Sequence, residues 1–260
     1  MIVLTESASR HIRDLLRTAS LRREFNEFVI EGRHLLEVAL DKRPDLIDQI
    51  LFTEAAAASC SKLFDRCINS GLDMLSVSPK LASRISDTQE PQGIFAVLKM
   101  PVPKATASGN VILALDAVQD PGNVGTIIRT AAWFGVTTIF LGEGTADPFS
   151  PKVVRSTQGA IFDVDLHNKV DLASELPMFN RQGWNVLAAT LSEAATSVYE
   201  LQTTDKTLLL LGSEAHGISD VLLSLSDAQI IVPRFGEGES LNVATSAAVI
   251  LSEIRRRGLR

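Results

Sequence analysis

The stretch Leu113–Val136, LALDAVQDPGNVGTIIRTAAWFGV, decides how the second half of this chain folds. An apolar run ends at Asp116, a Pro-Gly turn follows, and a helical pattern begins near Asn123, which predicts a strand, a tight loop and a helix. Two further stretches place polar residues and glycines directly after an apolar strand: LLLLGSEAHGIS from Leu208 and IIVPRFGEGESLNVATSAAVILSEI from Ile230. Because open α/β sheets bind ligands where their parallel strands end, we expect the three segments to form one site.

The same strand–loop–helix pattern extends over residues 111–260. Apolar runs predict strands at VILALD, TTIFLG, WNVLAAT, TLLLLG and AQIIVP, and a further helix is predicted from Pro151. Such near-continuous apolar strands are typical of a parallel sheet covered by helices on both faces. A long amphipathic helix, about Asn242 to Arg257, ends the pattern.

The first hundred residues predict a smaller α/β unit. Helical patterns cover 7–26, 33–42, 55–69 and 79–85, and strand patterns cover 27–32, 46–52, 74–78 and 93–100. PVPKATASGN, residues 101–110, has two prolines and no periodicity, which indicates a linker. The predicted domains are therefore 1–100 and 111–260.

Composition excludes several classes of protein. No apolar run approaches the ~20 residues that span a bilayer, and no secretory pattern is present at the N-terminus, so we expect a cytoplasmic protein without a membrane partner. Cys60 and Cys67 are the only cysteines, and they predict buried thiols rather than a metal or redox pair. The net charge is −6; residues 1–105 carry 14 basic and 14 acidic residues, and residues 106–260 carry 11 and 17. The acidic excess therefore lies in the second domain.

Within the first two segments, a few residues are candidates for chemistry. Asn123 suits the cap of the helix that follows it, and Arg129 falls among apolar neighbours in that helix, where a buried cation would need a polar partner. An ordinary capped helix with a surface arginine is the alternative. Gly212 and Glu214 end the four-leucine strand, where they predict either a ligand contact or a simple glycine turn. His216 is expected to be a loop residue, because no catalytic triad spacing surrounds it.

The third segment crowds Ser240, Asn242, Thr245 and Ser246 into the start of an apolar helix. Helix capping explains one of the first two, but it does not require both together with Ser246. Motifs for other ligands are missing: there is no phosphate-binding GxxxxGK[ST], no dinucleotide GxGxxG at a helix start, and no HExxH or paired CxxC for a metal.

Taken together and in this order, NVGTIIRTAAWFGV, GSEAHGIS and SLNVATS resemble the SpoU–TrmH branch of the SPOUT superfamily, the RNA ribose 2′-O-methyltransferases. SPKVVRSTQGAIF is similar to the segment between the first two family motifs, and FVIEG and PQGIFAV resemble the family's ribosomal-protein-like substrate-binding domain. Val232-Pro233-Arg234 departs from the Ile-Pro-Met sequence of many members. The resemblance implies a deep trefoil knot in the C-terminal domain, bound S-adenosylmethionine, a homodimer and no metal.

The resemblance also implies the roles of single residues. Arg129 would lie beside the reacting hydroxyl, either as base or as a charge that activates it, and Asn123 would orient that arginine or the ribose. The remaining implied residues are listed by role: catalytic, Glu214, Ser240 and Asn242; cofactor-binding, Thr190, Gly212, Val232 and Leu241; RNA-binding, Arg155.

We therefore expect methylation of a ribose 2′-hydroxyl in RNA, with 23S ribosomal RNA favoured over tRNA because a full N-terminal domain precedes the catalytic one. A basic cluster containing Arg10, Arg22 and Arg23 is expected to contact RNA phosphates, although such a run is often only a solvated face. The alternatives are a tRNA methyltransferase, a non-catalytic RNA-binding ribosome-assembly factor of the same fold, and an unrelated nucleotide-using α/β enzyme.

Overall fold

The structure is a computed structural model that describes residues 6–86, 88, 90–202, 205–238 and 240–258. The chain divides into an N-terminal unit, Met1–Val102 with Phe149–Phe162, and a C-terminal unit, Pro103–Pro148 with Asp163–Arg260. Residues 149–162 are the unexpected part of this division, because the sequence patterns assign them to the second domain.

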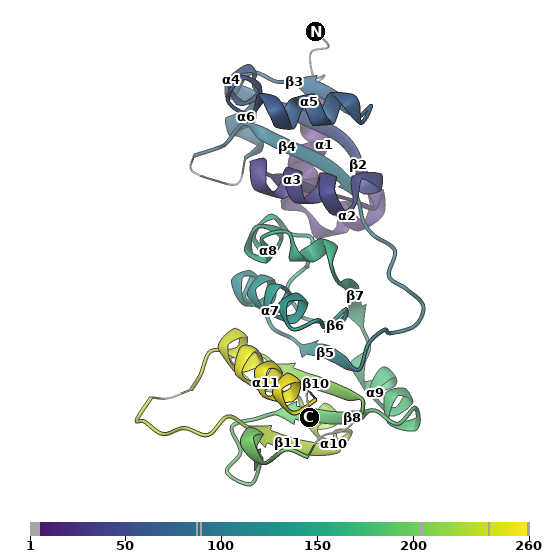
Figure 1. The fold of residues 1–260 in the computed structure, drawn as a ribbon, viewed down its shortest axis with the longest axis vertical. Coiled ribbons are helices and arrows are strands. Elements are labelled where there is room, and N and C mark those ends of the chain that lie inside the picture. The colour runs from purple at the N-terminus through teal and green to yellow at the C-terminus, as the bar shows by residue number, and fades with distance from the viewer. Residues whose placement is uncertain (1–5, 87, 89, 203–204, 239, 259–260) are drawn as a thin grey trace. The chain divides into compact units, whose positions relative to one another are not determined.

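The N-terminal unit is a four-stranded sheet with helices around it (Figure 1). Its strand order is β1 (Glu27–Glu31), β4 (Ile94–Lys99), β2 (Ile47–Phe52), β3 (Asp73–Ser76), and only the β2–β3 pair is parallel. The helices are α1 (Glu6–Arg17), α2 (Ala19–Phe25), α3 (Arg33–Lys42), α4 (Glu54–Ser59), α5 (Ser61–Asn69), α6 (Pro79–Ile85) and α8 (Pro151–Thr157), with 3₁₀ turns at Pro44–Leu46 and Ala160–Phe162.

Two long helices expected in this unit are each interrupted. Thr18 adopts an extended conformation (φ −124°, ψ 107°) and separates α1 from α2, and Cys60 (φ −125°, ψ 37°) separates α4 from α5. Both cysteines are free thiols: Cys67 is buried as expected, whereas Cys60 is half-buried.

Residues 149–162 pack against the rest of the N-terminal unit. The Phe149 ring lies 5.0 Å from the Phe28 ring, between centroids. Gly159 has φ +88°, and a Cβ there would lie 2.7 Å from Val38 Cγ1, so this glycine permits the close approach. α8 lies beside β1.

The C-terminal unit contains seven parallel strands in the order β7-β6-β5-β10-β8-β11-β9. The strands are β5 (Val111–Asp116), β6 (Thr138–Gly142), β7 (Asp165–Val170), β8 (Asn185–Ala189), β9 (Thr196–Ser197), β10 (Thr207–Gly212) and β11 (Ala228–Ile231). The helices are α7 (Pro121–Trp133), α9 (Leu172–Arg181), α10 (Asp220–Ser224) and α11 (Val243–Gly258), with a 3₁₀ turn at Val198–Glu200.

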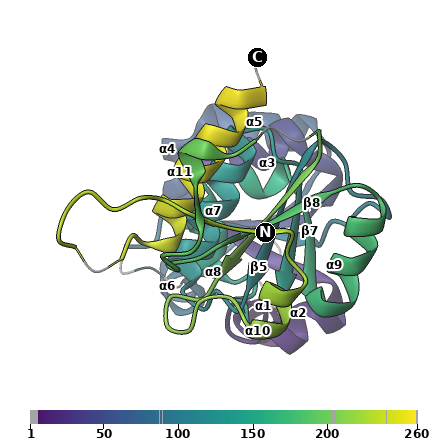
Figure 2. The same cartoon turned by 90° about the horizontal axis from the view of Figure 1, so that it is seen from below.

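Helices cover both faces of this sheet, as the apolar strands predict (Figures 1 and 2). One face packs on α9 and α10 through Leu208, Leu210 and Phe179. The alternate residues of β10, Leu209 and Leu211, are also buried and lie on the face that carries α7 and α11. Each fully buried leucine contributes about 1.5–3 kcal/mol to folding.

Several elements of the C-terminal unit were not predicted, among them the two-residue strand β9. β7 reads DLHNKV, is polar and lies at the sheet edge, so it lacks the apolar run by which the other strands are recognised. α9 contains Pro177, and α10 has only five residues. The last helix, by contrast, was predicted to within one residue at each end.

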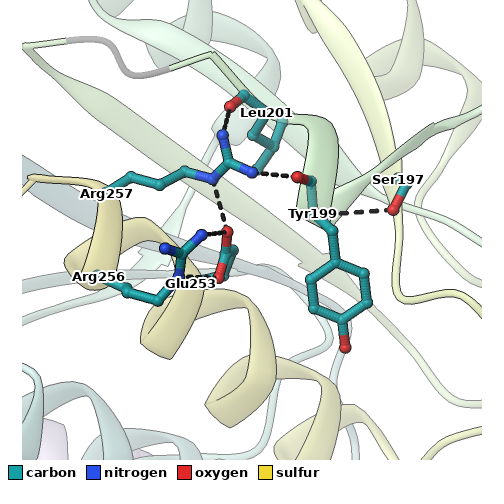
Figure 3. Close-up of polar contacts among 6 residues, drawn as sticks. All are labelled: Ser197, Tyr199, Leu201, Glu253, Arg256 and Arg257. Carbon is teal, nitrogen blue, oxygen red and sulfur yellow. Dashed lines mark hydrogen bonds and ion pairs between the residues drawn. The ribbon is translucent and has the colours of Figure 1, made fainter.

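The carboxyl-terminal end of α11 is held by charged side chains (Figure 3). Arg257 donates hydrogen bonds to the carbonyls of Tyr199 and Leu201, and its Nε donates to Glu253 Oε1 at 2.6 Å. Glu253 also accepts two bonds from Arg256. Segment 199–201, which is part of the connection between β9 and β10, is thereby held against the helix.

Candidate active site

The carboxyl ends of four neighbouring strands meet along one edge of the C-terminal sheet. β5, β10, β8 and β11 are adjacent and parallel, so the segments that follow them lie at the same edge. Three of those segments are the polar-glycine stretches of the sequence, as expected.

α7 begins at Pro121, two residues earlier than predicted, and its cap is Asp120 rather than Asn123. The Asp120 carboxylate accepts the Asn123 backbone N–H at 2.9 Å. The prediction that Asn123 caps this helix is therefore wrong. The aspartate satisfies the free N–H groups at the helix start, and this leaves the Asn123 side chain available for other partners.

Asn123, Glu214 and Asn242, one from each segment, form a hydrogen-bonded network. Asn123 Nδ2 donates to Glu214 Oε1 at 2.5 Å, and Asn242 Nδ2 donates to Asn123 Oδ1 at 3.0 Å. Residues 91 and 119 positions from Asn123 in the chain are thus brought together.

The direction of these hydrogen bonds follows from the start of α11. Asn242 Oδ1 accepts the backbone N–H groups of Ala244 (2.9 Å) and Thr245 (3.3 Å). Because its oxygen caps the helix, the amide nitrogen of Asn242 faces Asn123 and must donate. The Asn123 oxygen then accepts, and its nitrogen donates to Glu214, which serves as the acceptor at the end of the chain.

The loop that carries Glu214 is built on close backbone contact. A Cβ at Gly212 would lie 2.2 Å from the Gly217 carbonyl carbon, so only glycine fits there. Ser213 and Gly217 exchange backbone hydrogen bonds, and Asp116 Oδ2 accepts the Ser219 N–H at 2.8 Å. Sequence reasoning missed Asp116 and Asp120, although an acid at a strand end and an Asp-Pro pair were visible signals.

Arg129 and Ser240 stand apart from the network. Both are exposed, and neither side chain makes a hydrogen bond or ion pair with any residue that the structure describes. Arg129 follows Asn123 by six positions, which turns it about 120° around the helix axis. The expectation that Asn123 orients Arg129 within one chain is therefore not supported.

The four predicted cofactor residues lie at the same edge. Thr190 and Val232 directly follow β8 and β11, Gly212 ends β10, and Leu241 precedes the cap of α11. All four are partly or fully exposed. The Thr190 N–H donates to Ile230 O at 2.9 Å, and the Thr190 hydroxyl oxygen accepts the Ser192 N–H at 3.3 Å, so Thr190 offers a ligand its carbonyl and its hydroxyl proton.

The sequence matches two known families that together cover most of the chain. Residues 110–252 match the SpoU rRNA Methylase family, and residues 29–103 match the RNA 2'-O ribose methyltransferase substrate-binding family. The chain belongs to the SpoU rRNA methylase family.

Relatives in known proteins and solved structures agree with this assignment. The chain is 35% identical over 240 residues to the 23S rRNA (guanosine(2553)-2'-O)-methyltransferase RlmP of Bacillus subtilis, covering 92% of this chain and 93% of the relative. It is 29% identical to the 23S rRNA (uridine(2479)-2'-O)-methyltransferase of Streptomyces viridochromogenes, over 71% of this chain and 68% of the relative. Among solved structures, an AdoMet-bound rRNA methyltransferase from Sinorhizobium meliloti superposes with a TM-score of 0.84 at 28% identity, covering 98% and 97%.

In this member of the SpoU family the predicted RNA-binding arginines have different environments. Arg10 and Arg23 are exposed. Arg22 is only 3% exposed, and its Nη1 donates to the Leu15 carbonyl at 2.5 Å. The expectation that Arg22 contacts RNA is therefore wrong, because its guanidinium is buried where it links α2 to α1. Arg155 is half-buried on α8.

Within the part of the chain that the structure describes, no cluster of three or more His, Cys, Asp or Glu side chains could hold a metal ion. In the same part, no helix has both the length and the apolarity that crossing a membrane requires.

Proposed function

We propose that this SpoU family member transfers a methyl group from S-adenosylmethionine to a ribose 2′-hydroxyl of ribosomal RNA, with 23S rRNA as the substrate. The observation that carries the proposal is the Asn242–Asn123–Glu214 network at the carboxyl edge of the sheet. The names of the Bacillus and Streptomyces relatives support 23S rRNA. Those two act on different nucleotides, so the nucleotide has to be mapped.

The strand ends fit the cofactor. Gly212 is bare of a side chain, and Thr190, Val232 and Leu241 present partly or fully exposed groups beside it. These four would hold the adenine and ribose of S-adenosylmethionine by backbone hydrogen bonds and apolar contact. When bound, the cofactor supplies an electrophilic methyl group on a sulfonium. AdoMet in the Sinorhizobium structure supports this choice.

The chemistry forms a bond from the ribose 2′-oxygen to the methyl carbon, breaks the bond from that carbon to sulfur, and releases the hydroxyl proton. A ribose hydroxyl is a poor nucleophile until its proton is removed, so positioning and proton removal carry the catalysis. Asn123 and Asn242 each retain an amide proton that can orient the ribose, and Glu214 holds Asn123 in place. Arg129 would act on the hydroxyl as a base or through its positive charge.

A homodimer would bring Arg129 to a network. Arg129 shares the exposed face of α7 with Trp133, which lies one turn further along and is 83% exposed. We propose that this face is covered by a second copy of the chain, so that Arg129 serves the network of the other copy. Tryptophan is enriched among the residues that contribute most of the binding free energy of protein–protein interfaces.

The trefoil knot and the cytoplasmic location remain part of the proposal. The fastening of segment 199–201 to α11 through Arg257 supports a helix that threads a neighbouring loop. The proposed substrate, ribosomal RNA, supports a cytoplasmic location of the protein. We further propose that Arg10, Arg23 and Arg155 contact RNA phosphates, since the N-terminal unit matches a substrate-binding family.

The test uses the purified full-length chain, S-adenosylmethionine with a labelled methyl group, and in vitro transcripts of 23S rRNA and of tRNA. We expect label in 23S rRNA on a 2′-oxygen, mapped by resistance to alkaline hydrolysis. Label only in tRNA would favour the tRNA alternative. RNA binding without S-adenosylmethionine binding in calorimetry would favour a non-catalytic assembly factor. Light scattering reports whether the chain is a dimer.

A further inference from the structure

The described part of the loop between β11 and α11, residues 232–238 and 240–241, projects away from the sheet of its unit in both views (Figures 1 and 2). Phe235 lies in this loop and is 89% exposed. Among the large apolar side chains that the structure describes, it is the most exposed. An aromatic ring held in water costs solvation free energy, which calls for a partner.

The loop has a defined shape on either side of the ring. Arg234 Nη1 donates to the Gly238 carbonyl at 2.8 Å and so closes the turn that contains Phe235. A Cβ placed on Gly236 or Gly238 would meet no atom within 4 Å. These two glycines therefore add no side chain that could cover the ring from within this turn.

The position of the loop relates Phe235 to the active site. The loop starts at Val232, one of the cofactor residues, and runs to Leu241, which directly precedes Asn242 of the network. The loop that carries Phe235 is thus connected at both of its ends to the candidate active site. RNA that presents a ribose to this site has its neighbouring nucleotides within reach of the loop.

The charges of the loop favour a base over a phosphate as the partner. The loop sequence has one basic residue, Arg234, and two acidic residues, Glu237 and Glu239, so its net charge of −1 disfavours phosphate. Each base, by contrast, has a π-face that stacks on an aromatic ring without needing charge. In unpaired RNA the bases can be splayed out of the stack, and they are then available to stack on an aromatic side chain.

We propose that Phe235 is a substrate-binding residue that stacks on an unpaired base of the RNA next to the ribose that is methylated. This inference rests on the proposed function. Stacking needs an aromatic ring and leaves the phosphate contacts unchanged, so its contribution to RNA affinity does not depend on salt in the way that arginine contacts do.

The experiment compares wild type with Phe235→Ala, Phe235→Leu and Phe235→Trp on the 23S rRNA transcript at saturating S-adenosylmethionine. We expect the Ala and Leu variants to raise KM for the RNA on the order of tenfold, with kcat near wild type, and the Trp variant to retain the wild-type KM. The slope of RNA affinity against salt concentration should stay unchanged. Met178→Ala, which removes an exposed apolar side chain on α9, is the matched control and should behave as wild type.

Several results overturn the stacking proposal. One is an unchanged KM in Phe235→Ala, and another is full activity in Phe235→Leu, which would indicate simple apolar contact. Loss of S-adenosylmethionine binding in calorimetry would place the ring in the cofactor pocket, and a monomer in light scattering would place it in a dimer interface. Failure of the proposed function itself is distinct, since the wild type would then methylate no RNA.

Discussion

The two ends of α11 are held in opposite ways. At the amino end, Asn242 caps the helix with its oxygen and gives one amide proton to Asn123, and its side chain is exposed. At the carboxyl end, Arg255 donates to the carbonyls of Phe134 and Gly135 and to Asn110 Oδ1, at 2.6, 3.0 and 2.8 Å. Arg257 and Glu253 add the contacts drawn in Figure 3.

The carboxyl end of α11 anchors the helix to the rest of its unit, whereas the amino end can bind a ligand. The carbonyls of Phe134 and Gly135 end α7, where a cation is favoured by the helix dipole and by free carbonyl groups. Those charge-assisted hydrogen bonds fix α11 in place. The amino end uses neutral amides and keeps spare donors, so a ligand can be oriented there without breaking the anchor.

The largest expected effect comes from replacing Arg129, and the comparison is with Arg255, whose guanidinium makes three hydrogen bonds. Arg129→Ala should lower methylation by about 10²-fold or more, because charge stabilisation or proton removal at the hydroxyl is lost. Thermal unfolding and S-adenosylmethionine affinity should stay near wild type, since Arg129 has no partner among the described residues. Single-turnover kinetics and calorimetry measure both.

Arg255→Ala is the matched control, and it should do the reverse. Loss of hydrogen bonds from a charged group to three acceptors should cost about 2 kcal/mol or more of stability, seen as a lower Tm, while the remaining folded protein stays active. Wild-type single-turnover rates in Arg129→Ala would remove Arg129 from the mechanism.

Asn242 tests whether capping and network roles can be separated. Asn242→Asp keeps the oxygen that caps α11 but cannot donate to Asn123, and its charge would repel Glu214. We expect methylation to fall on the order of tenfold with Tm close to wild type. Asn242→Ala should lose the same activity and also about 1 kcal/mol of stability from the lost cap. Equal Tm values for the two variants would show that the cap contributes nothing.

At the anchored end, Glu253 gives a pH-dependent effect. Hydrogen bonds from Arg256 and Arg257 lower the pKa of Glu253 to about 2. A depressed pKa in the folded state means that the carboxylate stabilises the protein above the unfolded pKa of about 4.3, and that this stabilisation is lost as pH falls toward 2. Glu253→Gln should therefore lower Tm at pH 7, and the difference from wild type should shrink below about pH 4. A Tm difference that is constant with pH would indicate lost packing instead.

Patterns with strong local causes were readable from the sequence. Leu208–Leu211 predicted a buried strand, and the Pro-Gly turn and SLNVATS placed Asn123 and Asn242 at strand ends where they do meet. The linker at 101–110 contains no helix or strand. These features depend on residues close in sequence, so periodicity and turn chemistry suffice.

Features that depend on distant partners were not readable. In the sequence Arg22 cannot be told apart from the exposed arginines around it. Its burial follows from the break at Thr18, which brings its guanidinium to the Leu15 carbonyl. Phe149 gives no local sign that its partner is Phe28. The direction of the Asn123 amide needed both Asp120 and Asn242, which lie on different segments.

The smallest effect is expected from the surface arginines of the N-terminal unit, and Arg22 supplies its control. Arg10→Glu combined with Arg23→Glu should weaken binding of 23S rRNA a few-fold at low salt and should reduce the steepness of its salt dependence, because each phosphate contact releases counterions. Arg22→Met removes a third positive charge from the same short stretch, but this charge is buried against the Leu15 carbonyl. It should lower Tm and leave the salt dependence of the folded protein unchanged. If instead Arg22→Met flattened the salt dependence as much as the double charge reversal does, net charge would govern binding and no phosphate contact could be assigned to Arg10 or Arg23.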